Sequence, residues 1–478
     1  MKTGFEIVSG DTHGLNDVSG FIETINSIET LFENGSELTI TRAPGRLDVM
    51  GGIADYSGSL VLELPISEAT FVALQKDDSR QLRIVSLVDD KTRNLEMALS
   101  DLERDGEPIE YDEAQRFFKQ HWAAYVAGVF LVLSRELGAR FDHGARLLIS
   151  SRVPEGKGVS SSAALEVATM SAVAAAFAIN IGPRELALLC QQVENLVVGA
   201  PCGVMDQMTA ACGEANHLLS MICQPAELQG SIKLPEDLAV WGLDSGVRHS
   251  IGAGDYGSVR AGTFMGYRII AELAGFKATQ SGAQVVIDDP LWGGYLANLT
   301  PSEYEERFAT HMPESLSGEE FIVLYGGTTD HVTKVERERN YAVRAPAEHA
   351  IYESARVKKF AELLDKQATR SSLGDKMAMG ELMYASHDSY SRCGLGSRGT
   401  DLLVGLVRAF GVDQGLFGAK ITGGGSGGTV AVLGNSDAEP AVLDLAHRYA
   451  AVMGHEPYIF RGSSPGSAAF GNLVIRRN

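Results

Sequence analysis

The sequence predicts a mixed α/β fold divided into two or three lobes. Its 478 residues are too many for a single hydrophobic core. Apolar residues at helical spacing over residues 117–137, followed by Gly138, predict a helix with a glycine at its end. Strands are predicted where β-branched and apolar residues gather between turn signals, at residues 38–41, 61–64, 70–75 and 83–87.

Composition and charge narrow the class of protein. A hydrophobic share of 45% and a charged share of 21% are typical of globular proteins. The net charge of −20 argues against a nucleic-acid surface, which needs clustered Lys and Arg. The 5 cysteines form no CxxC pair and fit thiols in a reducing compartment. With no signal-peptide pattern, and no apolar stretch of membrane-spanning length, the sequence favours a cytoplasmic enzyme.

In chain order, residues 21–32 are expected to form a leader helix and the charged residues 89–116 an exposed loop. The segment 42–59 then stands out because glycines separate its charged residues. Glycines allow close approach of the backbone to a ligand, and the polar side chains between them can reach a small hydroxylated molecule. The alternative is an ordinary surface turn between two strands.

A second glycine-rich segment follows a strand predicted at 145–150 and opens a helix that continues to about residue 179. It places Gly156 and Gly158 before three consecutive serines. Free N–H groups and the positive end of the helix dipole suit a phosphate, and serine hydroxyls can bind phosphate or metal. The segment does not match a Walker A loop, and the alternative is that the serines only cap the helix.

Asp206 is the next candidate. It follows a helix predicted at 183–198 and lies in an apolar, glycine-punctuated setting. There a carboxylate is either a helix cap or a functional base. Residues 215–234 are expected to form a hairpin, and a lobe boundary is expected between 225 and 238.

The second half is less regular. A short strand is predicted at 240–243, a helix from Arg260 to about residue 274, and irregular structure at 277–317. The apolar run 321–325 fits helix or strand, and helices are predicted at 351–364 and 377–390. Gly423, Gly425 and Gly428 formally match a dinucleotide fingerprint, but a strand follows them where that fingerprint needs a helix. A glycine link that lets two strands and a ligand approach closely is the better interpretation.

Three segments in this order and spacing resemble the three motifs of the GHMP small-molecule kinases: RAPGR…DY at 42–56, PEGKGVSSSA at 154–163 and KITGGGSGG at 420–428. CGVMDQ at 202–207, VRHS at 247–250 and SHDS at 386–389 resemble the galactokinase branch. Within it the chain is most similar to the kinase portion of plant L-arabinokinases. The resemblance implies two lobes, an N-terminal ribosomal-protein-S5-domain-2-like α/β lobe (1–230) and a C-terminal ferredoxin-like α+β lobe (238–478).

The resemblance also implies roles for single residues. Asp206 would be the base and Arg46 its charged neighbour, with ATP and Mg²⁺ as the implied cofactors. Ser162 and Glu194 would hold the metal, since both offer hard oxygen ligands. Residues implied in sugar binding are Asp55, Gly52, Ile53, Gly203 and Tyr256. Residues implied in ATP binding are Gly156, Lys157, Gly158, Ser160, Ser161, Ser162, Gly424 and Gly425.

One departure from the resemblance bears on the sugar. Galactokinases carry Glu-His near the sugar's exocyclic hydroxymethyl group, where this chain has Gly52 and Ile53. An apolar wall there fits L-arabinose in its pyranose form, which lacks that group. Restoring Glu and His is predicted to move the preference toward galactose.

The predicted function is therefore an ATP-dependent sugar-1-kinase that acts on L-arabinose. A kinase of galactose or of another galactose-like sugar is the first alternative. A sensor that binds ATP and sugar without catalysis is the second, although such sensors tend to lose part of the serine loop, which is complete here. A monomer or small homo-oligomer is expected.

Overall fold

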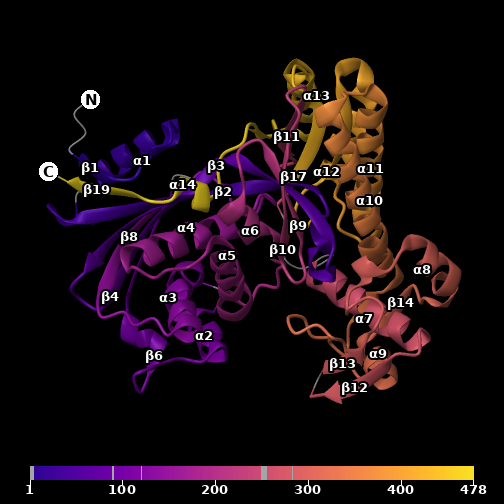
Figure 1. Ribbon diagram of the computed structural model, residues 1–478, viewed down its shortest axis with the longest axis horizontal. Coiled ribbons are helices and arrows are strands. Elements are labelled where there is room, and N and C mark those ends of the chain that lie inside the picture. Colours follow the sequence, from indigo (N-terminus) through magenta and orange to yellow (C-terminus); the bar gives the residue numbers. More distant parts are fainter. Residues whose placement is uncertain are drawn as a thin grey trace.

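The computed structural model describes residues 5–28, 30–88, 91–119, 121–248, 256–282 and 284–477. Two sheets with helices packed on them and a smaller unit of helices and hairpins make up this part of the chain (Figure 1). The predicted mixed α/β fold is thereby confirmed. None of the helices described is both long and apolar enough to span a bilayer.

The larger sheet contains nine strands within the described residues and is mostly antiparallel. β4 and β8 are a parallel pair within it. The strands run in the order β1 (Phe5–Ser9), β19 (Leu473–Arg477), β2 (Glu37–Met50), β3 (Leu60–Asp77), β8 (Gly144–Ser151), β4 (Gln81–Val88) and β5 (Lys91–Ala98), and the hairpin of β9 (His217–Ile222) and β10 (Glu227–Lys233) joins β3.

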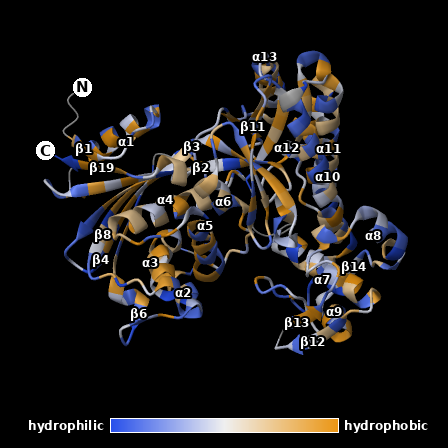
Figure 2. Ribbon diagram, viewed as in Figure 1, coloured by the Kyte–Doolittle hydropathy of each residue, from blue (hydrophilic) through white to orange (hydrophobic). Residues whose placement is uncertain are grey.

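Alternation of side chains along β3 gives this sheet two buried faces. Phe71 packs with α1 (Asn16–Ser27), whereas its neighbour Val72 packs on the other side with α3 (Ala124–Leu137) and α4 (Ser161–Ala176). Figure 2 shows α3 coloured largely as hydrophobic, as its burial requires. The remaining helices of this lobe are α2 (Tyr111–Phe118), α5 (Pro183–Gln192) with the π-helical turn η3 (Val193–Val198), and α6 (Met205–Cys212).

The smaller sheet has the strand order β16 (Leu416–Ile421), β17 (Thr429–Asn435), β11 (Leu238–Asp244) and β18 (Ile459–Phe460). Its apolar residues pack with helices of the same lobe. These helices are α10 (Arg344–Thr369), α11 (Leu373–Arg392), α12 (Arg398–Phe410) and α13 (Glu439–Met453). The short helix α14 (Ser467–Phe470) precedes β19.

A separate unit with its own core follows β11 and lies below α10 and α11 in Figure 1. It begins with α7 (Tyr256–Leu273), and Figure 2 shows that its helix α8 (Pro301–Arg307) is largely hydrophilic. Its other elements are the hairpin β12 (Lys277–Ser281) and β13 (Gln284–Asp288), α8 (Pro301–Arg307), α9 (Gly318–Tyr325), and the pair β14 (Ser315–Ser317) and β15 (Asn340–Ala342).

One hydrophobic cluster joins the two sheets, since it contains Leu64 of β3, Val240 of β11 and Met383 of α11. The division of the chain at 230–238 stays a prediction. It is supported by the change of sheet between β10 and β11, although β19 returns to the larger sheet next to β2.

Several expected elements differ from those observed. The leader helix lies at Asn16–Ser27 rather than at 21–32, and the segment 89–116 contains β5 and part of α2 where a loop was expected. β5 pairs along all of β4, so its charged residues form an amphipathic edge strand. The run 321–325 is helical because Ser317 and Glu320 form a capping box that starts α9. The residues 277–317 hold a hairpin and a helix instead of irregular structure.

Candidate functional site

Three glycine-rich segments meet where the two sheets adjoin. The Arg46 guanidinium donates from Nη1 to the carbonyl of Gly158 (2.7 Å), which ties the first segment to the second. The Thr429 hydroxyl donates to the carbonyl of Lys157 (2.8 Å), which ties the third to the second. A Cβ on Gly423 would lie 2.8 Å from the carbonyl oxygen of Gly158. The glycine therefore permits an approach that no side chain would allow.

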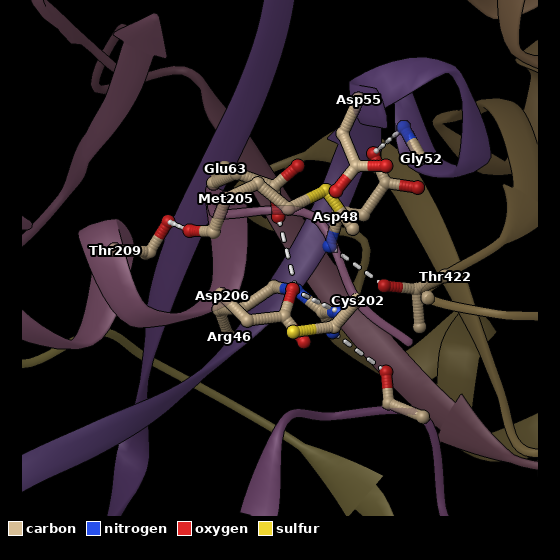
Figure 3. A network of polar contacts seen from close by, with 12 residues as sticks. Arg46, Asp48, Gly52, Asp55, Glu63, Cys202, Met205, Asp206, Thr209 and Thr422 are labelled. Atoms are coloured by element: carbon tan, nitrogen blue, oxygen red, sulfur yellow. Dashed lines mark hydrogen bonds and ion pairs between the residues drawn. The ribbon is translucent and has the colours of Figure 1, made fainter. Parts of the chain in front are cut away.

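A buried ion pair also joins the first and third segments. Lys420 on β16 pairs with Asp48 on β2 at 2.5 Å, and both side chains are fully buried. The backbone N–H of Asp48 donates to the hydroxyl of Thr422 at 2.6 Å (Figure 3). A buried pair of this kind is costly to break, because either charge alone would be left without a partner.

Arg46 and Asp206 form the centre of the site. Arg46 donates from Nε and Nη2 to Oδ1 of Asp206, at 3.0 and 2.7 Å (Figure 3). Asp206 stands in the first turn of α6, Val204 is the N-cap, and no side chain caps this helix. The Asp206 carboxylate therefore pairs with Arg46 and does not cap the helix.

A second carboxylate, Glu63, faces Arg46 at 3.2 Å and is fully buried. Burial acts to lower the pKa of Arg46, but nearby negative charge, that of Asp206 foremost, outweighs it and raises that pKa. Burial raises the pKa of Glu63 well above its usual range. Arg46 is therefore held as a cation opposite Asp206. Glu63 was not predicted as a site residue, because nothing in the local sequence distinguishes it from other residues of a strand.

Asp55 comes close to the loop before α6. A Cβ on Gly203 would lie 1.5 Å from Oδ2 of Asp55, so a side chain at position 203 would displace the Asp55 carboxylate. Burial and then the charge of Asp206 raise the pKa of Asp55 to about 7. Figure 3 shows Asp55 above the Arg46–Asp206 pair, on the turn η1 (Gly52–Ser57).

Tyr256 begins α7 and adds an aromatic wall to this site. Its ring meets that of Tyr56 edge-on, with centroids 5.7 Å apart. Arg260, one turn further on, lies over Tyr56 and makes two hydrogen bonds to Asp330, of 2.9 and 2.8 Å. A cavity of about 450 Å³ is lined by Tyr56, Arg260 and Asp330 together with Cys202. Arg260 was not predicted as a site residue. Of the VRHS segment, residues 249 and 250 lie outside the described residues.

The second segment forms a loop at the N-terminus of α4. Gly156, Gly158 and Ser160 all have positive φ, at 71°, 72° and 61°. Ser160 is the N-cap residue but makes no side-chain cap hydrogen bond, and its buried hydroxyl has no partner in the described structure. The serine there is therefore not explained as a helix cap. Lys157 is engaged elsewhere, in an ion pair of 2.5 Å with Asp244.

Two buried glutamates lie beside the serines. Gln207 donates from Nε2 to Glu194 (2.7 Å) and to Glu166 (3.1 Å), and Ser162 also hydrogen-bonds to Glu194. Burial and the charge of Asp206 raise the pKa of Glu194 to about 7. No group of three or more His, Cys, Asp or Glu side chains arranged for a metal occurs in the described part of the chain. Glu166 and Gln207 were not predicted from the sequence.

A second cavity, of about 430 Å³, adjoins the same loop. It is lined by Gly156, Ser161 and Ser162 at one end and by Trp122, Tyr125 and Leu165. An aromatic and aliphatic lining beside a phosphate-type loop suits a flat, apolar ring. Neither Trp122 nor Tyr125 was predicted, since nothing in their local sequence marks them.

The structure separates the remaining predicted residues into two groups. Gly424 lies near the ring of Tyr256, and Gly425 lies against Leu395. Neither of them makes the close contact with Gly158 that Gly423 makes. Gly52 and Ile53 are buried, and the backbone N–H of Ile53 donates to the hydroxyl of Tyr390 (2.9 Å).

Comparison with protein families gives three matches in order along the chain. Residues 29–76 match the galactokinase galactose-binding signature, residues 124–214 the GHMP kinases N terminal domain, and residues 360–451 the GHMP kinases C terminal region. The three matched ranges contain the three glycine-rich segments.

Among curated proteins, an L-arabinokinase from Arabidopsis thaliana is 45% identical over 99% of this chain. The chain spans about half of that relative, 52% of its length. A galactokinase from Chloroflexus aurantiacus is 31% identical over 86% of this chain and 88% of its own.

Among solved structures, Lactococcus lactis galactokinase complexed with galactose has a TM-score of 0.71 at 21% identity, covering 94% of this chain and 99% of its own. Methanococcus jannaschii mevalonate kinase has a TM-score of 0.54 at 15% identity, covering 89% and 98%. These two likenesses concern the fold.

Proposed function

This chain belongs to the GHMP kinases, in their galactokinase branch, and from that premise we propose that it transfers the γ-phosphoryl group of ATP to the anomeric hydroxyl of L-arabinose. The observation that carries the proposal is the Arg46–Asp206 pair at the meeting point of the three glycine-rich segments. A carboxylate held beside a buried cation and next to a phosphate-type loop is an arrangement suited to phosphoryl transfer.

Asp206 acts as the base in this proposal. Both hydrogen bonds from Arg46 reach Oδ1, so Oδ2 would take the proton of the anomeric hydroxyl as that oxygen attacks the γ-phosphorus. Arg46 holds the Asp206 carboxylate by two hydrogen bonds and would stabilise the negative charge of the transferring group. Asp55, Gly203 and Tyr256 would line the sugar pocket, Asp55 as an acceptor for a sugar hydroxyl.

ATP would bind with its phosphates at the loop of Gly156 to Ser162. The free N–H groups of the first turn of α4 and its helix dipole favour the negative charge of the phosphates. The neighbouring cavity lined by Trp122 would hold the adenine ring. Lys157, which the resemblance implies in ATP binding, would reach a phosphate only by leaving Asp244.

Mg²⁺ would be held by Ser162 and Glu194. The residues fit this ion, because a hydroxyl and a carboxylate lie in contact beside the phosphate-type loop and Mg²⁺ commonly uses one or two carboxylates plus substrate phosphates. A site of that kind needs no cluster of three protein carboxylates. When bound, the ion would neutralise phosphate charge, while Gln207 holds the Glu194 carboxylate in place.

L-arabinose is the preferred sugar in this proposal. The support is the 45% identity to the Arabidopsis L-arabinokinase and the apolar, hydroxyl-free character of Ile53. Galactose is the alternative, favoured by the galactokinase relatives. We place the reaction in the cytoplasm, because all five cysteines are free thiols.

The test is release of ADP from ATP with a panel of sugars: L-arabinose, D-galactose, D-fucose and D-galacturonic acid. The expected result is the highest kcat/KM with L-arabinose, and no sugar-dependent ADP release from Asp206→Asn above about one hundredth of the wild-type rate. Turnover of none of the four sugars by the folded wild type would contradict the proposal.

A further inference from the structure

Tyr390 lies near the end of α11 and joins the first and third glycine-rich segments. Its hydroxyl accepts the hydrogen bond from the backbone of Ile53 (2.9 Å) and donates one to the carbonyl of Gly423 (3.1 Å). The side chain is fully buried, and its ring meets His349 edge-on with centroids 5.2 Å apart. Hydrogen bonds and packing together fix the position of the hydroxyl.

That hydroxyl occupies the space that a side chain at position 52 would need. A Cβ on Gly52 would lie 1.6 Å from the Tyr390 hydroxyl oxygen, 2.7 Å from Asp48 Oδ2 and 2.8 Å from Tyr390 Cζ. Nonbonded carbon atoms need about 3.5 Å, so the two groups exclude each other. Gly52 also has a φ of +45°, which favours glycine independently of the neighbour.

This contact changes the prediction made from the sequence about Gly52. Exchanging Gly52 and Ile53 for Glu and His was expected to move the preference toward galactose. The shift in preference stays a prediction, but the structure counts against the two-residue change, because a glutamate side chain at position 52 would start inside the Tyr390 hydroxyl. Any polar group at this position requires a change at Tyr390 first.

Neither hydrogen-bonding group of the Ile53–Tyr390 contact is left for a sugar. The single proton of the Tyr390 hydroxyl goes to Gly423, and the N–H of Ile53 is already used. A hydroxymethyl group pressed against this contact would lose hydrogen bonds to water that these two groups could not replace. The residues packed in this apolar cluster include Ile53, Tyr56, Tyr390, Leu395 and Ile421, with Tyr256 against it.

We propose that Tyr390 is a specificity-determining residue, which together with Gly52 closes the sugar pocket to a hydroxymethyl group that L-arabinose lacks. This inference rests on the proposed function, because it takes the sugar to bind against the segment of Ile53 and Asp55. The inference goes beyond the proposed function because it assigns the choice of sugar to a residue of α11 that is 337 positions from Ile53 in the chain.

The first experiment measures the contact without any sugar, by a double-mutant cycle in melting temperature. Gly52→Ala is compared in the wild type and in Tyr390→Leu, with Gly138→Ala as the strain control. Gly138 has a φ of +66°, and a Cβ there would meet nothing within 4 Å, so its substitution costs only backbone strain. Gly52→Ala is expected to lower the melting temperature more than the control in the wild type, and by clearly less in Tyr390→Leu, where only the contact with Asp48 Oδ2 remains. Equal effects in both backgrounds would overturn the steric exclusion.

The second experiment measures kcat/KM for D-galactose and L-arabinose. Tyr390→Leu, which opens space beside Gly52, is expected to raise the galactose-to-arabinose ratio about tenfold or more. Tyr390→Phe, which keeps the ring, is expected to lower both values by a similar factor. An unchanged ratio in Tyr390→Leu would reduce Tyr390 to a structural role.

If Tyr390→Leu does not melt cooperatively, the same melting and kinetic measurements are made on Tyr390→Met, because the flexible methionine side chain can fill irregular space in a core. A wild type that phosphorylates neither sugar would overturn the proposed function and the specificity role together. The melting cycle would still decide whether Tyr390 and Gly52 exclude each other, so the two failures can be told apart.

Discussion

Replacing Asp206 by Asn removes the proposed base and changes little else. The side chains are nearly isosteric, and an amide oxygen in the place of Oδ1 can still accept from Nε and Nη2 of Arg46. Both hydrogen bonds become weaker because the acceptor is neutral, so we expect a loss of about 1–2 kcal/mol in the free energy of unfolding. Removal of general-base catalysis is expected to lower kcat by about 10²–10⁴-fold.

Glu63→Gln is the matched control for this substitution. It removes the other carboxylate that faces Arg46, at a comparable distance of 3.2 Å, but leaves Asp206 in place. Because the pKa of Glu63 is raised well above its usual range, its protonated form is favoured, and Gln resembles that form. We therefore expect less than about a tenfold effect of Glu63→Gln on kcat, which corresponds to about 1.4 kcal/mol.

The assay is steady-state ADP release at saturating ATP and sugar, with melting temperatures to confirm folding. Sugar binding to each variant is measured by calorimetry, which separates binding from catalysis. The reasoning is refuted if Asp206→Asn keeps wild-type kcat with sugar binding intact, or if both variants lower kcat alike. The second result would mean that Asp206 serves only to neutralise Arg46.

Three further predictions concern the metal, the pH and the nucleotide. Ser162→Ala is expected to raise the Mg²⁺ concentration needed for half-maximal rate while leaving sugar affinity unchanged, and an unaltered Mg²⁺ titration would exclude Ser162 as a ligand. Because burial raises the pKa of Asp55 to about 7, its contribution to stability is fully present below the unfolded pKa of about 4 and is lost as pH rises to 7. The melting temperature of the wild type should therefore fall relative to Asp55→Asn between about pH 4 and 7 and level off above that range, and a constant difference would argue against it. Trp122→Ala is expected to raise KM for ATP roughly tenfold, as loss of a base-stacking ring does, without changing KM for sugar, and an effect on both would point to general damage.

The regular elements with strong local signals were predictable from the sequence. The helix that ends at Gly138 is present, and Gly138 has the left-handed conformation of a helix C-cap. A strand follows the third glycine-rich segment, as the rejection of a dinucleotide fingerprint required. Elements were harder to predict where a cap or a partner strand decides whether the segment is a helix or a strand, as α9 and the edge strand β5 show.

The site was predictable mainly where its residues lie in or near segments that contain glycines. Arg46, Asp206, Asp55 and Gly203 are brought together as expected, and the contact of Asp55 with Gly203 explains one glycine. Glu63, Trp122 and Tyr390 owe their positions to tertiary packing between distant segments. No local pattern marks such residues, because a buried strand glutamate or a helix tyrosine acquires its role only from the partner that folding supplies.

Identification of the product tests the central claim most directly. The wild type would be incubated with ATP, Mg²⁺ and L-arabinose, and the products followed by phosphorus NMR. The account predicts one phosphate ester whose phosphorus signal is split by the anomeric proton, formed in equal amount with ADP and absent with Asp206→Asn. A phosphate ester at another hydroxyl, or ADP formed without any phosphosugar, would contradict it.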